Sequence, residues 1–169
     1  LTHRSYLNEH PGFGLEHNER LEFLGDAVLE LVMTEYLFGQ YPDKNEGELT
    51  AYRAALVNAE ALAEAAAALG VNDPLRLSRG EALDTGRARQ AILANTLEAI
   101  IGALFVDQGY PVARDFIARH LFPKVEQVVA DNLWQDAKSQ FQERAQALCA
   151  VTPSYRVLAE RGPDHDRIF

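Results

Sequence analysis

The chain has 169 residues, of which 47% are hydrophobic and 24% charged, and its formal net charge is −9 at pH 7. This composition is typical of a folded globular protein and predicts one domain of about 100–150 residues plus a remainder. Proteins usually neutralise nucleic-acid phosphates with a surplus of Lys and Arg, and neither residues 1–130 nor residues 131–169 carry one. Charge alone therefore argues against nucleic-acid binding.

Cys149 is the only cysteine, which excludes an intrachain disulfide and favours a reducing compartment, so we expect a cytoplasmic protein. The longest apolar-rich stretch, residues 91–106, is shorter than the roughly 20 residues of a bilayer span and contains Glu98. We therefore expect a buried helix there and no membrane partner. No basic region followed by an apolar core opens the chain, which argues against a signal peptide.

Residues 11–14, Pro-Gly-Phe-Gly, predict a loop, and a helix with both acidic and apolar positions is predicted from near Glu19 to Phe38. Glu19, Glu22 and Asp26 are spaced i, i+3, i+7, which places three carboxylates on one face. Only Arg20 is close enough in sequence to pair with them. Uncompensated carboxylates held together favour binding of a cation, although a solvated acidic face remains an equally open interpretation of the pattern alone.

The run from Glu19 to Leu29, Glu-Arg-Leu-Glu-Phe-Leu-Gly-Asp-Ala-Val-Leu, resembles the signature motif of the ribonuclease III family. Members of that family cut double-stranded RNA with Mg²⁺. Residues 2–6, Thr-His-Arg-Ser-Tyr, are similar to the segment that precedes the signature. The resemblance implies a mostly α-helical fold with an all-helical endonuclease domain over residues 1–132, and Mg²⁺ as cofactor with Mn²⁺ as a substitute.

Further helices are predicted to begin at Asn45 and Asn58, which are good N-cap residues, and Gly70 predicts a helix end. Glu46 follows the first of these caps, where negative charge suits the positive end of a helix. The resemblance implies a second role, because the family also has an acidic residue twenty positions after the signature Asp. Glu46 and Glu19 would then hold a second cation or order water, and both interpretations stay open.

Residues 71–90 contain Pro74, Gly80 and Gly86 and predict irregular structure. Four arginines lie in or at the end of this segment: Arg76, Arg79, Arg87 and Arg89. They form the densest positive cluster before residue 130, so we predict that RNA phosphates approach there, with Arg87 and Arg89 as RNA-binding residues. Scattered solvated arginines are the alternative.

Residues 91–105 predict a helix that is apolar on nearly all sides, and an ionised Glu98 within it needs a partner. The segment resembles the second motif of the family, in which an Asp and a Glu three residues apart complete the metal site. Asn95 stands where most members have Asp. The resemblance implies that Glu22, Asp26, Asn95 and Glu98 bind the metal, with Asp26 and Glu98 as the catalytic residues. An amide oxygen still coordinates Mg²⁺ but removes one charge, so we expect weaker metal binding.

Gly109 predicts a helix end, and Pro111 and Pro123 suit the first turns of two more helices. A linker follows near residue 133. Residues 136–143 resemble the first helix of a double-stranded RNA-binding domain, residues 154–160 alternate like a strand, and residues 162–165 resemble the loop that such domains insert into the RNA minor groove. The resemblance implies RNA contacts by Gln142, Glu143, Gly162, Pro163 and His165. The chain stops at Phe169, and we expect the domain to continue beyond that point.

The resemblance as a whole implies a metal-dependent endoribonuclease that hydrolyses double-stranded RNA, including rRNA and mRNA precursors, to 5′-phosphate and 3′-hydroxyl ends with short 3′ overhangs. It also implies a homodimer whose two sites cut opposite strands. Phe23, an apolar residue between two acids, is predicted to lie in the dimer interface, and packing in the core of one chain is the open alternative.

Two other functions are weighed against this one. A catalytically weakened or inactive RNA-binding scaffold of the same fold is favoured by Asn95 and disfavoured by Glu22, Asp26 and Glu98. A di-iron carboxylate bundle requires Glu-x-x-His pairs, and no histidine in the sequence follows a glutamate by three positions. The second alternative is therefore set aside.

Overall fold

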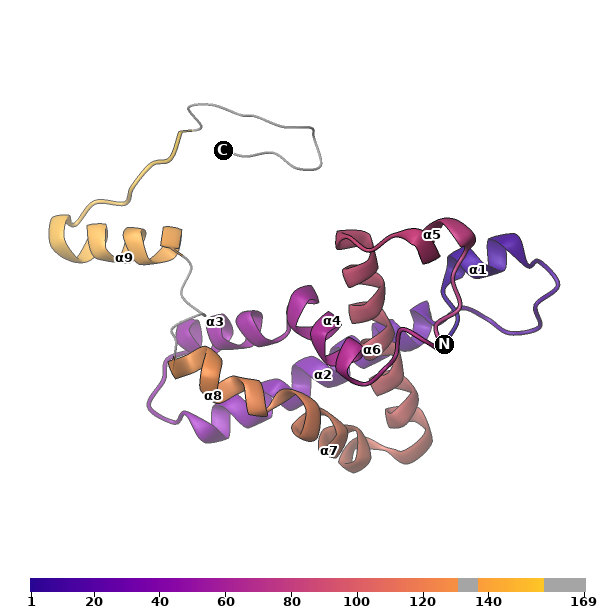
Figure 1. The fold of residues 1–169 in the computed structure, drawn as a ribbon. Coiled ribbons are helices and arrows are strands. Elements are labelled where there is room, and N and C mark those ends of the chain that lie inside the picture. Colours follow the sequence, from indigo (N-terminus) through magenta and orange to yellow (C-terminus); the bar gives the residue numbers. More distant parts are fainter. Residues whose placement is uncertain (131–136, 157–169) are drawn as a thin grey trace. The chain divides into compact units, whose positions relative to one another are not determined.

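Two long helices, α2 (Glu19–Gln40) and α6 (Arg87–Gln108), form the centre of the fold and pack against each other more extensively than any other pair of helices in the described chain (Figure 1). The computed structural model describes residues 1–130 and 137–156. α2 confirms the helix predicted around the carboxylates. Its buried residues recur mostly every three or four positions, which gives the helix one apolar face: Gly25, Val28, Leu29, Val32, Met33 and Leu37.

α2 and α6 cross at two glycines, where their backbones touch. A Cβ atom added to Gly25 would lie 1.7 Å from the carbonyl oxygen of Glu98, and one added to Gly102 would lie 2.1 Å from the carbonyl oxygen of Leu21. Both distances are far below the roughly 3.5–4.0 Å of van der Waals contact, so only glycine permits this approach. The crossing brings the turn of α2 that carries Asp26 against the turn of α6 that carries Glu98.

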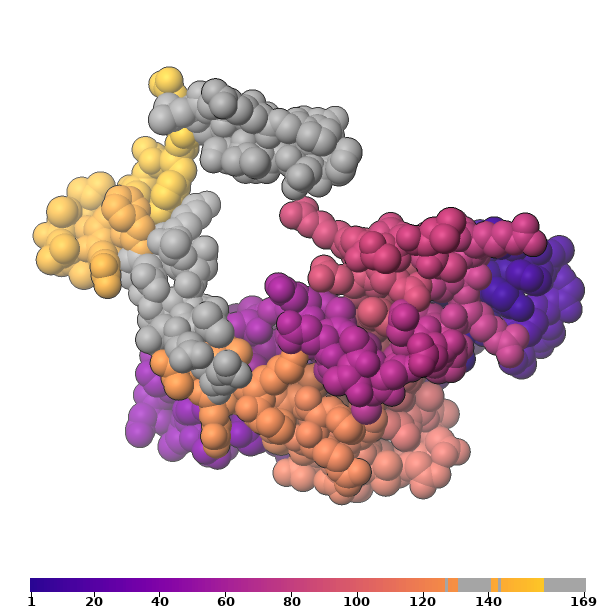
Figure 2. All heavy atoms as spheres, in the orientation of Figure 1, coloured from indigo at the N-terminus to yellow at the C-terminus, as the bar shows by residue number. Residues whose placement is uncertain are grey.

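Shorter helices surround this pair: α1 (Arg4–Glu9), α3 (Glu46–Leu56), α4 (Ala59–Ala68), α5 (Arg79–Leu83), α7 (Tyr110–Leu121) and α8 (Pro123–Ala130). α4 and α7 pack against α6, while α3 and α8 pack against each other. Figure 2 shows the orange atoms of α8 beside the purple and magenta atoms of α3 and α4. Lys124 of α8 forms a 2.7 Å ion pair with Glu64 of α4.

The predicted helix starts are confirmed by their caps. The side chain of Asn45 accepts a hydrogen bond from the backbone N–H of Glu48, whose carboxylate accepts one from the N–H of Asn45. The side chain of Asn58 accepts a hydrogen bond from the backbone N–H of Ala61 at the start of α4, without the return bond of the Asn45 cap. Such caps satisfy backbone donors that have no partner within the helix. The two prolines likewise lie in the first turns of α7 and α8, as predicted.

Two short helices were not predicted. α5 lies within the segment 71–90 that was predicted to be irregular, and α1 lies in the segment before the signature motif. Ser78 caps α5 by accepting a hydrogen bond from the N–H of Glu81, and His3 caps α1 through the N–H of Ser5. Helices of five and six residues are too short to display a hydrophobic periodicity, so the sequence pattern does not reveal them.

α6 is long and apolar enough to cross a membrane by length and composition, but the structure makes it a core helix. It contacts α2, α4 and α7, which confirms the buried helix predicted over residues 91–105. Its buried residues lie on several sides: Ile92, Leu93, Ala94, Thr96, Leu97, Ala99, Ile101 and Gly102. Glu98 is the acidic residue in the middle of this apolar run, and its side chain is half-buried.

By its internal contacts the chain divides into two units, Leu1–Trp134 and Gln135–Phe169. In the second unit α9 (Ala137–Cys149) forms where an amphipathic helix was predicted. Residues 150–156 contain no strand, so the strand predicted over residues 154–160 is wrong for residues 154–156, and residues 157–160 lie outside the described residues. A strand needs a hydrogen-bonded neighbour, and the described part of this unit provides none. The mostly helical fold is confirmed for the residues that the structure describes.

Candidate metal centre

The four residues predicted to bind a metal lie on the two helices that cross. Glu22 and Asp26 are one turn apart on α2, and Asn95 and Glu98 are one turn apart on α6, so each pair shares one face of its helix. Asp26 and Asn95 are exposed, whereas Glu22 and Glu98 are partly buried. The group therefore lies at the edge of the core, within reach of solvent.

Glu98 lies among negative charges. Burial, followed by the charges of Asp26, Glu22 and Glu30, raises the pKa of Glu98 from 4.5 to about 7. Burial and then the charges of Glu19 and Asp26 raise the pKa of Glu22 as well. The carboxylates of α2 and α6 thus share one electrostatic environment. Glu30 was missed by the sequence reasoning, although its position four residues after Asp26 on the same helix is a signal that could have revealed it.

The chemistry of this group fits a divalent cation. Carboxylate and amide oxygens are the ligands that Mg²⁺ prefers, and concentrated negative charge favours a cation. Among the residues that the structure describes, however, no three acidic, histidine or cysteine side chains converge closely enough to hold an ion. Ionised Asp26 and Glu98 repel each other, because their charges have the same sign. Joint coordination by Asp26 and Glu98 therefore stays a prediction about the cation-bound protein.

The raised pKa of Glu98 predicts pH-dependent stability in the absence of divalent cations. A carboxyl group whose pKa is higher in the folded protein stabilises the fold while it is neutral, so its contribution is present below pH 4.5 and is lost as the pH rises through about 7. We expect the melting temperature of the wild type in EDTA to fall relative to that of Glu98→Gln between about pH 5 and pH 8. A constant difference across this range would contradict the raised pKa.

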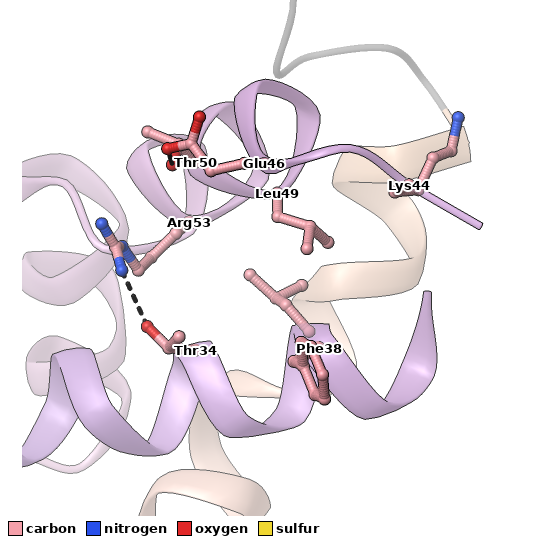
Figure 3. Close-up of a pocket in the computed structure, with 8 residues that line it drawn as sticks. Thr34, Phe38, Lys44, Glu46, Leu49, Thr50 and Arg53 are labelled. Atoms are coloured by element: carbon pink, nitrogen blue, oxygen red, sulfur yellow. Dashed lines mark hydrogen bonds between the residues drawn. The ribbon is translucent and has the colours of Figure 1, made fainter. Parts of the chain in front are cut away.

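The two acids predicted for a second cation lie in different surroundings. Glu19 forms an ion pair with Arg4 at 3.4 Å, one of its carboxylate oxygens lies 3.7 Å from Nδ1 of His17, and its charge reaches Glu22. Glu46 instead accepts a 3.2 Å hydrogen bond from Thr50 and borders a groove of about 470 Å³ between α2 and α3 (Figure 3). The α2 side of this groove is formed by residues about two to three turns beyond Asp26. The structure thus gathers Glu19 near the carboxylates and associates Glu46 with the groove.

The predicted arginine cluster divides between tertiary contacts and the surface. The guanidinium of Arg76 lies over the ring of Phe13, 4.8 Å from its centre. Arg89 donates from Nε to the side-chain oxygen of Asn72 at 3.0 Å, which ties α6 to the loop between α4 and α5. Arg87 is exposed in the first turn of α6. RNA binding by Arg87 and Arg89 stays a prediction, and the contact of Arg89 with Asn72 gives it a structural role in addition.

Phe23 is 81% exposed, so the alternative that it packs in the core of one chain is wrong. Leu31 and Phe38, which are 57% and 75% exposed, lie about 80° and 60° around α2 from Phe23 at 100° per residue. An apolar face of three large side chains therefore points away from the core. The sequence reasoning missed Leu31 and Phe38 as members of this face, although their spacing on one helix reveals it.

Five residues were predicted to contact RNA from the second unit. Gln142 and Glu143 lie on α9, and Gln142 is exposed. Gly162, Pro163 and His165 lie outside the described residues. Contact of these five residues with an RNA duplex stays a prediction.

Comparisons with known proteins show which family this chain is similar to. A family model described as Ribonuclease-III-like matches residues 1–125. The chain is 45% identical over its whole length to Ribonuclease 3 of Desulforamulus reducens and covers 69% of that protein. It is also 45% identical to Ribonuclease 3 of Bdellovibrio bacteriovorus, again over its whole length, and covers 72% of it.

Solved structures agree with the sequence comparisons. A ribonuclease III nuclease domain from Campylobacter jejuni, studied for flexibility in its region of dimer formation, is 41% identical and superimposes with a TM-score of 0.64 over 72% of this chain and 80% of that one. Dicer from Pichia stipitis is 29% identical, with a TM-score of 0.58 over 89% of this chain and 72% of that one.

Proposed function

Because this chain belongs to the ribonuclease III family, we propose that Glu22, Asp26, Asn95 and Glu98 bind the Mg²⁺ with which it cleaves RNA. The family and its relatives make the chain an endoribonuclease specific for double-stranded RNA. The observation that carries the proposed site is the crossing of α2 and α6 at Gly25. At this crossing the charges of Asp26 and Glu22 act on Glu98, which is far from both in sequence.

Hydrolysis of a phosphodiester needs an activated water, stabilisation of the phosphoryl oxygens and assistance to the leaving 3′ oxygen, and bound divalent cations supply all three. The chain contributes oxygen ligands from two helices whose relative position is set by a backbone contact. Asp26 and Glu98 are the residues that we propose to be indispensable, while Glu19 and Glu46 order water or a second cation. The proposed products carry 5′-phosphate and 3′-hydroxyl ends with short 3′ overhangs.

Cleavage of duplex RNA distinguishes the enzyme from the RNA-binding scaffold. We expect the protein to cut a perfectly paired RNA in Mg²⁺ or Mn²⁺ and to leave it intact in EDTA. Electrophoresis of an end-labelled duplex measures both. Binding of the duplex without cleavage in either metal would favour the scaffold, for which Asn95 is the supporting observation.

Asn95→Asp is expected to lower the Mg²⁺ concentration for half-maximal cleavage. The substitution adds one negative charge to a site that holds a hard cation chiefly by charge, and a change of roughly tenfold is typical of altering the surroundings of a bound metal. A titration of the initial cleavage rate with Mg²⁺ measures the effect. Asn58→Asp is the matched control, because it adds the same charge at the N-cap of α4. An equal response of the two variants would mean that position 95 does not act on the metal.

We further propose a homodimer that joins two such sites through the exposed face of Phe23, Leu31 and Phe38. Large apolar side chains that gather on one face of a soluble protein usually mark a protein interface. Two sites would then cut opposite strands, and duplex specificity needs no reading of bases because A-form shape and 2′-hydroxyl contacts suffice. Sedimentation equilibrium tests this assembly, and a monomer at micromolar concentration would refute it.

The second unit is proposed to be the first part of a double-stranded RNA-binding domain, joined to the endonuclease domain by a linker near residue 133. Its RNA contacts would come from α9 and from the segment around His165. The proposed substrates are rRNA and mRNA precursors in the cytoplasm. Sequencing of RNA ends that accumulate when Asp26→Asn replaces the wild type in cells would identify them, and unchanged RNA ends would exclude this role.

A further inference from the structure

Arg53 of α3 links that helix to the carboxylate-bearing helix α2. Its Nε lies 2.7 Å from a carboxylate oxygen of Glu30, and its Nη1 donates a 2.8 Å hydrogen bond to the hydroxyl of Thr34. Figure 3 shows the guanidinium directed from α3 toward Thr34 on α2. Thr34 in turn donates to the backbone carbonyl of Glu30 at 2.6 Å. Arg53 is therefore held by two neighbouring residues of α2.

Glu30 lies one turn beyond Asp26 on α2, and its charge reaches Glu98. Glu30 is the first carboxylate on α2 beyond the proposed ligand Asp26. A free carboxylate at this position would be an additional oxygen ligand for a divalent cation, and it would compete with the proposed site. The ion pair with Arg53 engages that carboxylate.

We propose that Arg53 is a positioning residue that engages Glu30 and thereby confines the divalent cation to the Asp26 and Glu98 end of the carboxylate group. This inference rests on the proposed metal site. Arg53 does not need to touch the cation or the RNA for this role. It acts by removing a competing ligand.

The partial exposure of the Arg53–Glu30 ion pair distinguishes a role in positioning the cation from a role in stabilising the fold. The side chains of Arg53 and Glu30 are 33% and 40% exposed, and ion pairs with that much exposure contribute little to stability. Arg53→Gln should therefore fold. It frees Glu30, so the site keeps or gains affinity for cations while the cation shifts away from the position needed for cleavage. A lower kcat without weaker cation binding is the result that a structural defect would not produce.

The test compares Arg53→Gln, Glu30→Gln and the double variant in the full chain. At saturating Mg²⁺ we expect Arg53→Gln to lower kcat by about ten- to a hundredfold, as changes around metal ligands do. Cation binding, measured by calorimetry with Mn²⁺ and no RNA, should be as tight as in the wild type or tighter. The double variant should recover kcat to within about threefold of Glu30→Gln, because Arg53 has no task once residue 30 is neutral.

Two further variants sharpen the comparison. Arg53→Lys should retain part of kcat, since a lysine still pairs with Glu30 but lacks the planar guanidinium group with several N–H donors. Lys44→Gln removes a charge from the same groove, where Lys44 pairs with Glu48 rather than Glu30, and should leave kcat unchanged.

A double variant as impaired as Arg53→Gln would overturn the inference, because Arg53 would then act through a group other than Glu30. Wild-type kcat in Arg53→Gln, or cation binding weakened in step with kcat, would overturn it as well. A wild type that binds no divalent cation in the calorimeter would refute the proposed metal site itself. The two failures are therefore distinguishable.

Discussion

Glu98→Gln is expected to abolish cleavage of duplex RNA while the protein stays folded. The substitution removes a charged oxygen ligand from the proposed metal site. Changing a group that only supports a metal ligand lowers activity by up to about a hundredfold, so losing the ligand itself should lower the cleavage rate further. Burial and three neighbouring carboxylates already disfavour the ionised form of Glu98, so the neutral amide should not destabilise the fold. Cleavage rates of an end-labelled duplex at saturating Mg²⁺ measure the effect.

Glu60→Gln is the matched control for this experiment, because it removes the charge of an exposed glutamate on α4 that is not among the carboxylates around Glu98. It should cleave at the rate of the wild type. The melting temperature of both variants shows that the fold is intact. Activity of Glu98→Gln within a few fold of the control would remove Glu98 from the site and would leave Asn95 as the one proposed ligand on α6.

Gly25→Ala is expected to destabilise the protein by at least about 3 kcal/mol, the upper end of the usual cost of overpacking a core. The added methyl group would lie 1.7 Å from the carbonyl oxygen of Glu98 and 2.6 Å from its carbonyl carbon. Both are backbone atoms, so no side-chain rotation relieves the contact, and α2 and α6 must separate. Urea unfolding followed by circular dichroism measures the free energy of unfolding.

Gly39→Ala provides the comparison on the same helix. An added Cβ at Gly39 meets no atom within 4 Å, so the helix gains the propensity of alanine, and we expect stabilisation of up to about 1 kcal/mol. If Gly25→Ala were no less stable than Gly39→Ala, the backbone contact between α2 and α6 could not be what holds Asp26 near Glu98.

The local elements of this protein follow from short stretches of sequence. The capping box of Asn45 and Glu48 is formed by residues three positions apart, and the periodic apolar residues of α2 reveal its buried face. Such signals depend on neighbours within one or two turns, which is why a single sequence contains them. The signature motif also indicated the family and the candidates Glu19, Glu22 and Asp26, because a run of eleven residues is specific without any knowledge of the fold, and a second motif indicated Asn95 and Glu98.

The tertiary structure decided which of these residues meet. Nothing within a turn of Gly25 indicates that its backbone touches Glu98, and nothing around Glu30 indicates that Arg53 pairs with it. It also decided that Phe23 faces outward and that Arg76 covers Phe13. The physical reason is that hydrogen bonding and hydrophobic periodicity within a helix are local, whereas the crossing of two helices depends on close packing between surfaces that are distant along the chain. The sequence by itself therefore determined the longer helices and named every acid around Glu98 except Glu30, and the crossing at Gly25 and Gly102 determined which acids share one electrostatic environment.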